Sequence, residues 1–355
     1  MSFKFIDMDT AIKEISLLSE RVKKAALPEK LKEMVEVRLG QLAKLTESST
    51  FLPEFDRINT YIDWIAALPW NKKTQDNLDL TNAKQILDKN HFGLEEIKDR
   101  ILEYISVMKL KQEKGESQDI YRAPILCFVG LVGTGKTTIA YSIAEALGRK
   151  FARIPFGGMG DPLDLRGQSR MHAEAEPGKI IKALNVTQTK NPVILLDEIY
   201  RVTDAGRSSI MGVLVELLDP EQNHAFLDHY IDYPFDLSET LFIATANNTT
   251  NISTAVLDRL EPISMPSYTD AEKITIGSKY VLPKLMKLAG IPDGALVIED
   301  DVWPNIVRPL GFDAGIRTLE RNIEGVVRKV AKMIVEGKDK SFRITSQNVR
   351  EFLPQ

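Results

Sequence analysis

The sequence predicts an α/β fold with a parallel sheet, preceded by an N-terminal helical bundle and followed by a mainly α-helical region. Between about residues 124 and 266, apolar runs of strand length alternate with helical patterns, as in a parallel sheet covered by helices on both faces. Apolar residues recur at helical spacing before this stretch, and the strand pattern disappears after Thr269. We therefore expect a helical segment with a linker over 1–80, an α/β unit over 81–266 and a helical unit over 267–355.

The composition, with 43% hydrophobic and 27% charged residues, is that of an ordinary soluble globular protein. A net charge of -4 and a pI of about 5.8 provide no broad basic field, so nucleic acid is not indicated as a partner. The sequence has neither the apolar core of a signal peptide nor an apolar run of membrane-spanning length. We therefore expect a cytoplasmic chain without a membrane partner. Cys127, the single cysteine, lies in an apolar run and is interpreted as a buried structural thiol.

The N-terminal segment is expected to form three helices between about Thr10 and Leu68, each with an apolar stripe at helical spacing. The polar segment Asn71–Asp79 is interpreted as a linker. A short helix from Ala83 to about Lys89 and a longer one from Leu94 to Lys111 then lead to the first strand.

The α/β unit is expected to contain strands of four to six residues and helices between them. One helix covers Ile139 to Leu147, and another, opened by Pro177-Gly178, covers about Lys179 to Asn185. The predicted strands are Pro124–Val129, Phe151–Ile154, Val193–Leu196, Leu241–Thr245 and Glu261–Met265.

Helical patterns dominate the C-terminal unit. Thr269 and Glu272 have the spacing of a capping box, which opens a helix. The other predicted elements are helices at about Asp300–Val307 and Ala314–Val335, a short strand at Phe342–Ile344 and a terminal helix that reaches Leu353.

The first predicted strand runs directly into Gly130-Leu-Val-Gly-Thr-Gly-Lys136-Thr137-Thr138, and a helix follows. Strand, G-x-x-x-x-G-K-T and helix together are typical of a phosphate-binding P-loop, in which glycines let successive N–H groups point at one anion beside a helix N-terminus. Lys136 would neutralise the β- and γ-phosphates, and the Thr137 hydroxyl would bind Mg²⁺. We therefore expect ATP or ADP to contact Gly130, Leu131, Val132, Gly133, Thr134, Gly135, Lys136, Thr137 and Thr138.

Two acidic residues, Asp197 and Glu198, end the apolar strand that begins at Val193. Ligands bind at the carboxyl ends of strands in open α/β sheets, so Asp197 would hold Mg²⁺ and Glu198 would deprotonate the attacking water. Standing alone, the pair is equally typical of a solvated strand end. The P-loop favours the catalytic interpretation.

Three further residues are candidates for catalytic roles. Asn247 follows another strand, where it either positions the water or merely opens a turn. Arg259 precedes the last strand, and it is either a transition-state finger or part of a surface ion pair with Asp258 or Glu261. Arg317, which opens the long C-terminal helix, is either a phosphate contact or a solvated arginine.

With these residues, the chain from about Ile15 to Leu353 closely resembles the Lon family of ATP-dependent proteases, within the AAA+ ATPases. Apart from the P-loop, the resemblance is carried by Leu68-Pro-Trp70, His91-Phe-Gly93, Gly148-Arg-Lys-Phe151, Asp197-Glu-Ile199, Leu218-Asp-Pro-Glu-Gln-Asn223, Asp228-His-Tyr230, Pro234-Phe-Asp-Leu237, Leu257-Asp-Arg259 and Gly315-Ile-Arg317.

The resemblance implies roles for matching positions. Asn247 falls at the first sensor of the nucleotide state, and Arg317 falls at the second, on a helical lid. Arg259 falls at the finger that reaches a neighbouring subunit's site, so a homo-hexameric ring is implied. His91 and Phe92 match positions near the adenine, although His91 is also typical of a plain loop residue.

For function, the resemblance implies hydrolysis of ATP with Mg²⁺ that unfolds and translocates unfolded or damaged protein substrates, as in protein quality control. A rival enzymatic interpretation is a nucleic-acid remodelling ATPase such as a clamp loader or helicase, which the acidic pI disfavours. A non-enzymatic rival is a nucleotide-binding assembly scaffold.

The chain departs from the family in its extent. It ends at Phe352-Leu-Pro-Gln355, about where the linker to the family's protease domain begins, and it has only the helical piece of the family's large N-terminal region. We therefore expect no Ser–Lys proteolytic domain and no peptide cleavage by this chain. For an isolated module of this kind, a monomer remains an alternative to the ring.

The loops expected to face a central pore depart as well. His172 stands where the family has a tyrosine, with Ala173 and Glu174 beside it, and in a second loop Asp204 and Gly206 replace bulky aromatics. Because aromatic side chains offer large apolar contacts, these replacements would weaken the grip on substrate. Tyr200, where the family favours aspartate, is a further change.

Overall fold

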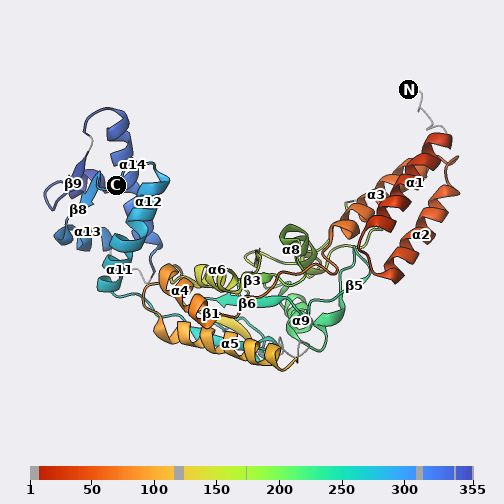
Figure 1. Ribbon diagram of the computed structural model, residues 1–355, viewed down its shortest axis with the longest axis horizontal. Coiled ribbons are helices and arrows are strands. Elements are labelled where there is room, and N and C mark those ends of the chain that lie inside the picture. Colours follow the sequence, from red (N-terminus) through yellow and green to blue (C-terminus); the bar gives the residue numbers. More distant parts are fainter. Residues whose placement is uncertain (1–7, 116–123, 173, 309–314, 340, 354–355) are drawn as a thin grey trace.

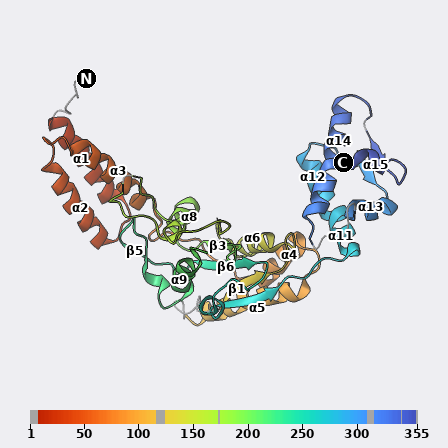
Figure 2. The ribbon, with the colours of Figure 1, turned by 180° about the vertical axis from the view of Figure 1, so that it is seen from behind.

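A computed structural model describes residues 8–115, 124–172, 174–308, 315–339 and 341–353. The molecule is elongated, with the N-terminal helices at one end, a mixed α/β region in the middle and a second helical region at the other end (Figures 1 and 2). No described helix combines the length and the hydropathy needed to cross a bilayer.

The three predicted N-terminal helices are present, as α1 (Met8–Lys24), α2 (Glu29–Ala43) and α3 (Phe51–Ala67). Their apolar stripes face one another and form a core that continues into one face of the central sheet. Trp70, which follows α3, joins the two regions, because its ring packs on Phe235 with centroids 5.0 Å apart.

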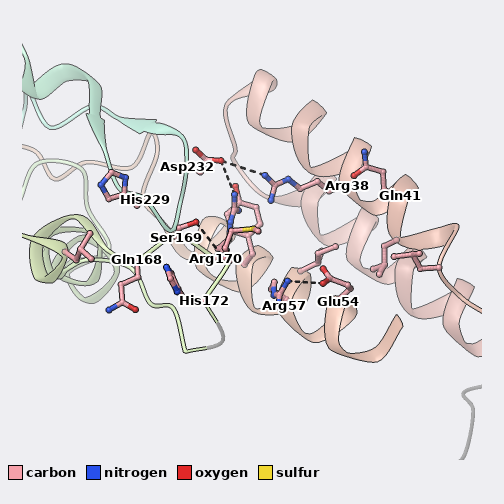
Figure 3. A pocket seen from close by; sticks show the side chains of 16 residues that line it. Arg38, Gln41, Glu54, Arg57, Gln168, Ser169, Arg170, His172, His229 and Asp232 are labelled. Atoms are coloured by element: carbon pink, nitrogen blue, oxygen red, sulfur yellow. Dashed lines mark hydrogen bonds and ion pairs between the residues drawn. The ribbon is translucent and has the colours of Figure 1, made fainter. Parts of the chain in front are cut away.

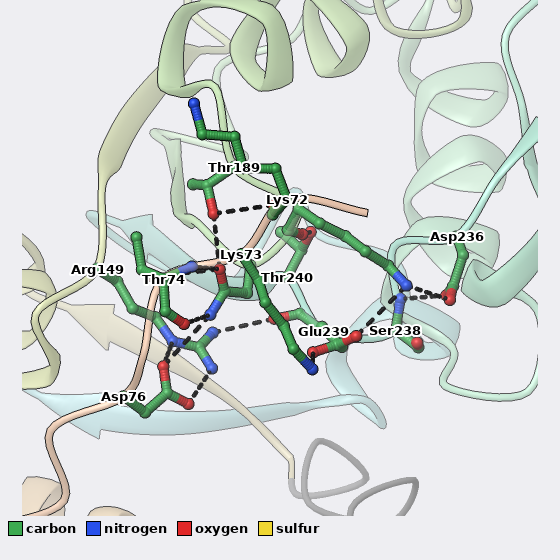
Figure 4. Close-up of polar contacts among 12 residues, drawn as sticks. Lys72, Lys73, Thr74, Asp76, Arg149, Thr189, Asp236, Ser238, Glu239 and Thr240 are labelled. Atoms are coloured by element: carbon green, nitrogen blue, oxygen red, sulfur yellow. Dashed lines mark hydrogen bonds and ion pairs between the residues drawn. The ribbon is translucent and has the colours of Figure 1, made fainter. Parts of the chain in front are cut away.

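The predicted linker 71–79 contains no helix before Leu80 and no strand, but it is fixed to the α/β region by buried polar contacts (Figure 4). The Arg149 guanidinium, whose side chain is fully buried, donates to both carboxylate oxygens of Asp76 at 2.7 and 2.6 Å. The Asn191 side chain accepts from the Thr74 N–H at 2.9 Å and donates to the Thr74 carbonyl at 2.8 Å. These contacts hold the linker to residues that shortly precede two neighbouring strands of the sheet.

The α/β region contains a five-stranded, entirely parallel sheet with the strand order β2-β3-β6-β1-β7, which confirms the predicted fold class. In register, Val193 of β3 lies opposite Leu241 of β6, and Phe128 of β1 lies opposite Thr245 of β6. The strands are β1 (Ile125–Val129), β2 (Phe151–Pro155), β3 (Val193–Asp197), β6 (Leu241–Ala246) and β7 (Leu260–Ser264).

Successive side chains of a β-strand point to opposite faces of its sheet. Alternating residues of each strand therefore face two separate cores. Leu126 and Phe128 pack with α4 (Leu80–Asn90), α5 (Glu95–Glu113) and α6 (Lys136–Leu147), which cover one face. Cys127 packs on the opposite face, and burial raises the pKa of its thiol to about 12, as expected for a structural thiol. That face is covered by α8 (Lys179–Thr187) and α9 (Arg207–Leu218).

Several elements are absent from the sequence prediction. Helix α9 was missed because its run of apolar residues lacks a clear period, and the other elements are too short for a period to show. The short additional elements are α7 (Leu163–Arg166), the 3₁₀ turn Asn223–Ala225, the antiparallel pair β4 (Phe226–Leu227) and β5 (Pro234–Phe235), α10 (Thr254–Leu257) and β8 (Leu296–Ile298).

The C-terminal region forms a separate core around Trp303, which is 2% exposed. Thr269 and Glu272 form the predicted capping box. The helix that they open continues through a π-helical turn at Gly277, where a Cβ would lie 2.7 Å from the Trp303 ring. The elements are α11 (Asp270–Ile276), the π turn Gly277–Val281, α12 (Leu282–Leu288), the 3₁₀ turn Asp300–Val302, α13 (Trp303–Val307), α14 (Arg317–Val335), β9 (Phe342–Ile344), paired with β8, and α15 (Val349–Phe352). The predicted start of the long helix, Ala314, lies outside the described residues.

Candidate active site

The loop between β1 and α6 has the backbone shape of a phosphate cradle. Gly133 and Gly135 adopt φ values of +83° and +95°, which residues with a side chain rarely adopt. At Gly130 a Cβ would lie 2.7 Å from the Met265 carbonyl oxygen, so only glycine fits there. The loop therefore turns tightly before α6, with the N-terminal N–H groups of that helix beside it.

Lys136, the first residue of α6, folds back over the loop. Its Nζ donates to the carbonyl oxygens of Gly130 and Leu131 at 2.6 and 2.8 Å, and to Oδ1 of Asn247 at 3.0 Å. Burial lowers the pKa of Lys136, while the carboxylates of Glu198 and Asp197 act in the opposite direction. The ammonium thus donates to neutral oxygens. The charged oxygens of a phosphate would bind it more strongly.

Asp197 ends β3 with a buried and firmly held carboxylate. Its Oδ1 accepts from the Thr245 hydroxyl at 2.5 Å, and its Oδ2 accepts from Arg153 Nε at 2.8 Å. Thr245 lies on the neighbouring strand β6, and Arg153 lies on β2, so the sheet order places one donor on each side. The carboxylate position is therefore set by the sheet itself.

Glu198 has a left-handed backbone with a φ of +58°. For a residue with a side chain this conformation costs about 1–2 kcal/mol, and such strain concentrates at functional sites. Its N–H donates to the Thr245 hydroxyl at 2.9 Å, and its Oε2 accepts from Arg201 at 2.8 Å. The strained turn directs Glu198 into the same cleft as the P-loop.

The cleft has a volume of about 240 Å³ and brings together ten of the predicted residues, namely Val132, Gly133, Gly135, Lys136, Thr137, Thr138, Asp197, Glu198, Asn247 and Arg317. The other residues that line it are Arg153, Arg201, Ile316 and Glu320. Cationic donors and carboxylates thus face one another across a space that suits a phosphate chain.

The start of α14 closes this cleft from the other side. The Ile316 N–H donates to the Gly133 carbonyl at 3.1 Å, which bonds the C-terminal region directly to the P-loop. At Gly315 a Cβ would lie 2.4 Å from the Val132 carbonyl oxygen, so glycine allows this approach. Arg317 follows immediately and reaches the cleft.

Six predicted residues are not among those that line the cleft, namely Gly130, Leu131 and Thr134 of the P-loop, and Arg259, His91 and Phe92. Arg259 donates to Oδ2 of Asp219 at 2.9 Å and not to Asp258 or Glu261, the ion-pair partners expected from sequence. The Nε2 of His91 lies 2.9 Å from the Ser142 hydroxyl, and burial lowers the pKa of His91 to about 4. Phe92 packs against the C-terminal region, with its ring 6.4 Å from that of Tyr280.

Sequence reasoning missed three residues that shape the site, and it gave no role to a fourth, Tyr200. Arg153 and Thr245 hold Asp197, Arg201 holds Glu198, and the Tyr200 phenol accepts a hydrogen bond of 2.7 Å from Nδ2 of Asn247. No local motif marks Arg153 or Thr245, because their roles arise only when strands β2, β3 and β6 lie side by side. Tyr200 was noted in the sequence, but its partner could not be predicted.

The residues present fit a nucleotide with Mg²⁺. Among the described residues, no cluster of three or more His, Cys, Asp or Glu side chains could hold a metal ion. Mg²⁺ is typically bound by one or two carboxylates together with substrate phosphates and water, so a single buried Asp197 beside Thr137 suits it. The glycine cradle provides the phosphate side of such a site.

A larger cleft, of about 790 Å³, lies between the N-terminal bundle and the loop with the predicted pore residues (Figure 3). Arg170 of this loop stacks over the Tyr61 ring at 3.9 Å and pairs with Asp232. His172 lines the cleft, and Ala173 lies outside the described residues. This contact joins the loop to α3.

The second predicted pore loop has no room for a bulky residue at one of its positions. A Cβ at Gly206 would lie 2.1 Å from the Gly160 carbonyl oxygen, so an aromatic residue there would require a different backbone. Asp204 is strongly exposed and pairs with Arg207 of α9.

The chain matches two family models. The ATPase family associated with various cellular activities (AAA) matches residues 126–267, and the Lon protease AAA+ ATPase lid domain matches residues 287–342. The first match includes the P-loop and Asp197, Glu198, Asn247 and Arg259. The second includes Arg317 and most of the C-terminal helical region.

Curated relatives match nearly the whole chain. It is 46% identical over 348 residues to a Lon protease of Lawsonia intracellularis, covering 98% of this chain and 40% of that protein. It is 42% identical to Lon protease 2 of Thermus thermophilus (96% and 42%) and 41% identical to a Lon protease of Bacillus thuringiensis (96% and 42%). The chain thus spans about 40% of the length of these relatives. It belongs to the AAA ATPases and carries the ATPase and lid domains of the Lon protease family.

Proposed function

We propose that this chain hydrolyses ATP in the cleft between the P-loop and the lid. The observation that carries the proposal is the convergence of Lys136, Asp197, Glu198 and Asn247 on the P-loop cleft. Lys136 would exchange its carbonyl partners for phosphate oxygens, and Glu198 would take the proton of the attacking water. When bound, Mg²⁺ would be held by Thr137 and Asp197 and would neutralise developing charge.

We propose that Arg259 acts in the site of a neighbouring copy. It is held by Asp219 and Ala255 and is not among the residues that line the cleft of its own chain, so a contact with phosphate requires a second subunit. The Asp219 pair also fixes the guanidinium, which lowers the entropy lost when it meets a phosphate. A ring of identical subunits, a hexamer as the resemblance implies, would complete each site.

Protein substrates are the proposed cargo of such a ring. The relatives are named as proteases, and we assign their peptidase activity to the part of them that this chain does not cover. The loop with Met171, which is 84% exposed, and His172 is the proposed substrate contact. Its attachment to α3 through Arg170 and Tyr61 would transmit force between loop and bundle.

Turnover measured against protein concentration, with mass in solution followed in parallel, tests this proposal. ATP turnover per chain should rise as the chain assembles and fall strongly in Arg259→Ala. Mixing Arg259→Ala with Glu198→Gln should restore part of the activity, because some interfaces then combine an intact Glu198 with an intact Arg259. If the chain stayed monomeric and its ATP turnover per chain were the same at every protein concentration, the proposal that Arg259 acts in the site of a neighbouring copy would be overturned. An inability to bind ATP would overturn the hydrolase itself.

A further inference from the structure

Tyr200 and Asn247 meet at the carboxyl edge of the sheet, where neighbouring strands end. Tyr200 lies in the turn after β3, and Asn247 directly follows β6. These strands are adjacent and parallel, so the side chains that follow them come together. Nδ2 of Asn247 donates to the Tyr200 phenol oxygen at 2.7 Å.

The orientation of the Asn247 amide follows from its partners. An ammonium has only hydrogens to donate, so the atom of Asn247 that faces Lys136 Nζ at 3.0 Å must be the oxygen. The amide nitrogen therefore faces Tyr200, whose oxygen accepts. Lys136, Asn247 and Tyr200 form one directed chain of hydrogen bonds.

The hydrogen bond from Asn247 to Tyr200 matters most when Lys136 binds phosphate. The terminal torsion of an asparagine is broad, so an amide held at only one end can turn. If Lys136 leaves Oδ1 for a phosphate oxygen, the bond to Tyr200 is the contact that keeps the amide in place. The second hydrogen on Nδ2 then keeps its direction, so that it can donate to a phosphate oxygen or a water in the cleft.

We propose that Tyr200 is a positioning residue that holds Asn247 in the orientation needed to distinguish ATP from ADP and to place the attacking water. Asn247 lines the cleft and Tyr200 is not among the described lining residues, so the effect of Tyr200 passes through Asn247. The inference rests on the proposed hydrolysis of ATP. It gives a physical role to the residue that replaces the family's aspartate at this position.

The Tyr200 ring also has a packing role, which the test must separate from that of its oxygen. The ring is partly buried. It packs against the core that the N-terminal helices share with one face of the sheet. Tyr200→Phe keeps the ring and removes only the phenol oxygen. Tyr141→Phe is the matched control. Tyr141 lies on α6 and is 55% exposed, and its edge-on contact with the Phe151 ring does not involve the phenol oxygen.

The test compares Tyr200→Phe, Asn247→Ala and the double variant with the unchanged chain. We expect Tyr200→Phe to lower kcat about tenfold, as the loss of one well-placed hydrogen bond would, with KM for ATP changed less than about twofold. In the Asn247→Ala background, Tyr200→Phe should add no more than about a twofold effect, because coupled residues are not additive. Tyr141→Phe should behave as the unchanged chain.

A binding measurement gives a second readout that needs no turnover. The ratio of the affinities for AMP-PNP and ADP should fall in Tyr200→Phe and in Asn247→Ala to a similar extent. An unchanged ratio and unchanged kcat in Tyr200→Phe would overturn the inference, and so would a full effect of Tyr200→Phe in the Asn247→Ala background. Absence of turnover in the unchanged chain would overturn the hydrolase proposal, while the binding ratio would still decide the role of Tyr200.

Discussion

The Ile316 N–H donates to the Gly133 carbonyl at 3.1 Å, so the lid is bonded to the backbone of the phosphate loop itself. These residues lie far apart in the sequence and belong to the helical lid and the α/β core. A movement of the lid therefore changes the P-loop directly, and Arg317, one residue further on, moves with it.

Gly315→Ala should weaken nucleotide binding. The added Cβ would lie 2.4 Å from the Val132 carbonyl oxygen and 2.6 Å from Gly133 Cα, so the lid would have to move away and lose its bond to the loop. We expect the affinity for fluorescent ADP to fall about tenfold. Gly212→Ala is the control, because nothing lies within 4 Å of its added Cβ. Equal affinities in the two variants would contradict the lid contact.

Arg153→Gln should destabilise the metal-free protein more than the protein loaded with Mg²⁺ and ADP. The Asp197 side chain is 6% exposed and would lose its charged partner, at a cost of about 1–3 kcal/mol. Mg²⁺ would replace the lost positive charge. Melting temperatures in EDTA and in Mg²⁺–ADP measure this difference.

Arg100→Gln serves as the control for Arg153→Gln, because Arg100 and Glu103 form an exposed ion pair that contributes little to the free energy of unfolding. Its melting temperature should stay near that of the unchanged chain under both conditions. If Arg153→Gln lowered the melting temperature equally in EDTA and in Mg²⁺–ADP, the arginine would not act through Asp197.

His91 should make the protein less stable in acid. Burial and the nearby Lys98 lower its pKa from 6.5 to about 4, so the unfolded chain binds the proton more readily. The stabilisation by neutral His91 is fully present above pH 6.5 and is lost as the pH falls towards 4. Between pH 7.5 and 5.0 this amounts to about 2 kcal/mol.

His91→Gln should remove this part of the pH dependence, because glutamine does not titrate and can still reach Ser142. Urea unfolding at the two pH values gives the free energies, and exposed His224→Gln is the control. A pH dependence in His91→Gln as steep as in the unchanged chain would show that His91 is not the group responsible.

Much of the fold was predictable because local patterns and tertiary structure agree. Strands β1, β3 and β6 are apolar runs of strand length, and the P-loop stands between a strand and a helix, so both could be placed from sequence. Helix α9 was not predicted, since a helix that is apolar around most of its circumference carries no periodic signal.

The candidate site was most readily predictable where a motif fixes spacing along the chain. Lys136, Thr137, Asp197 and Glu198 stand in such motifs. The ion pair between Arg153 and Asp197 depends on strand order, which no local pattern encodes. The left-handed backbone of Glu198 likewise results from the turn packed against Thr245, and its sequence gives no sign of it.

Glu198→Gln offers the most direct test of ATP hydrolysis in this cleft. The amide keeps the size and the polar contacts of the side chain but cannot take a proton from water. We expect the variant to bind ATP with Mg²⁺ as tightly as the unchanged chain and to lose at least about a hundredfold in turnover. Lys136→Ala, in contrast, should lose nucleotide affinity. Turnover by Glu198→Gln at the unchanged rate, measured as phosphate release, would contradict the assignment of Glu198 as the base and of this cleft as the catalytic site.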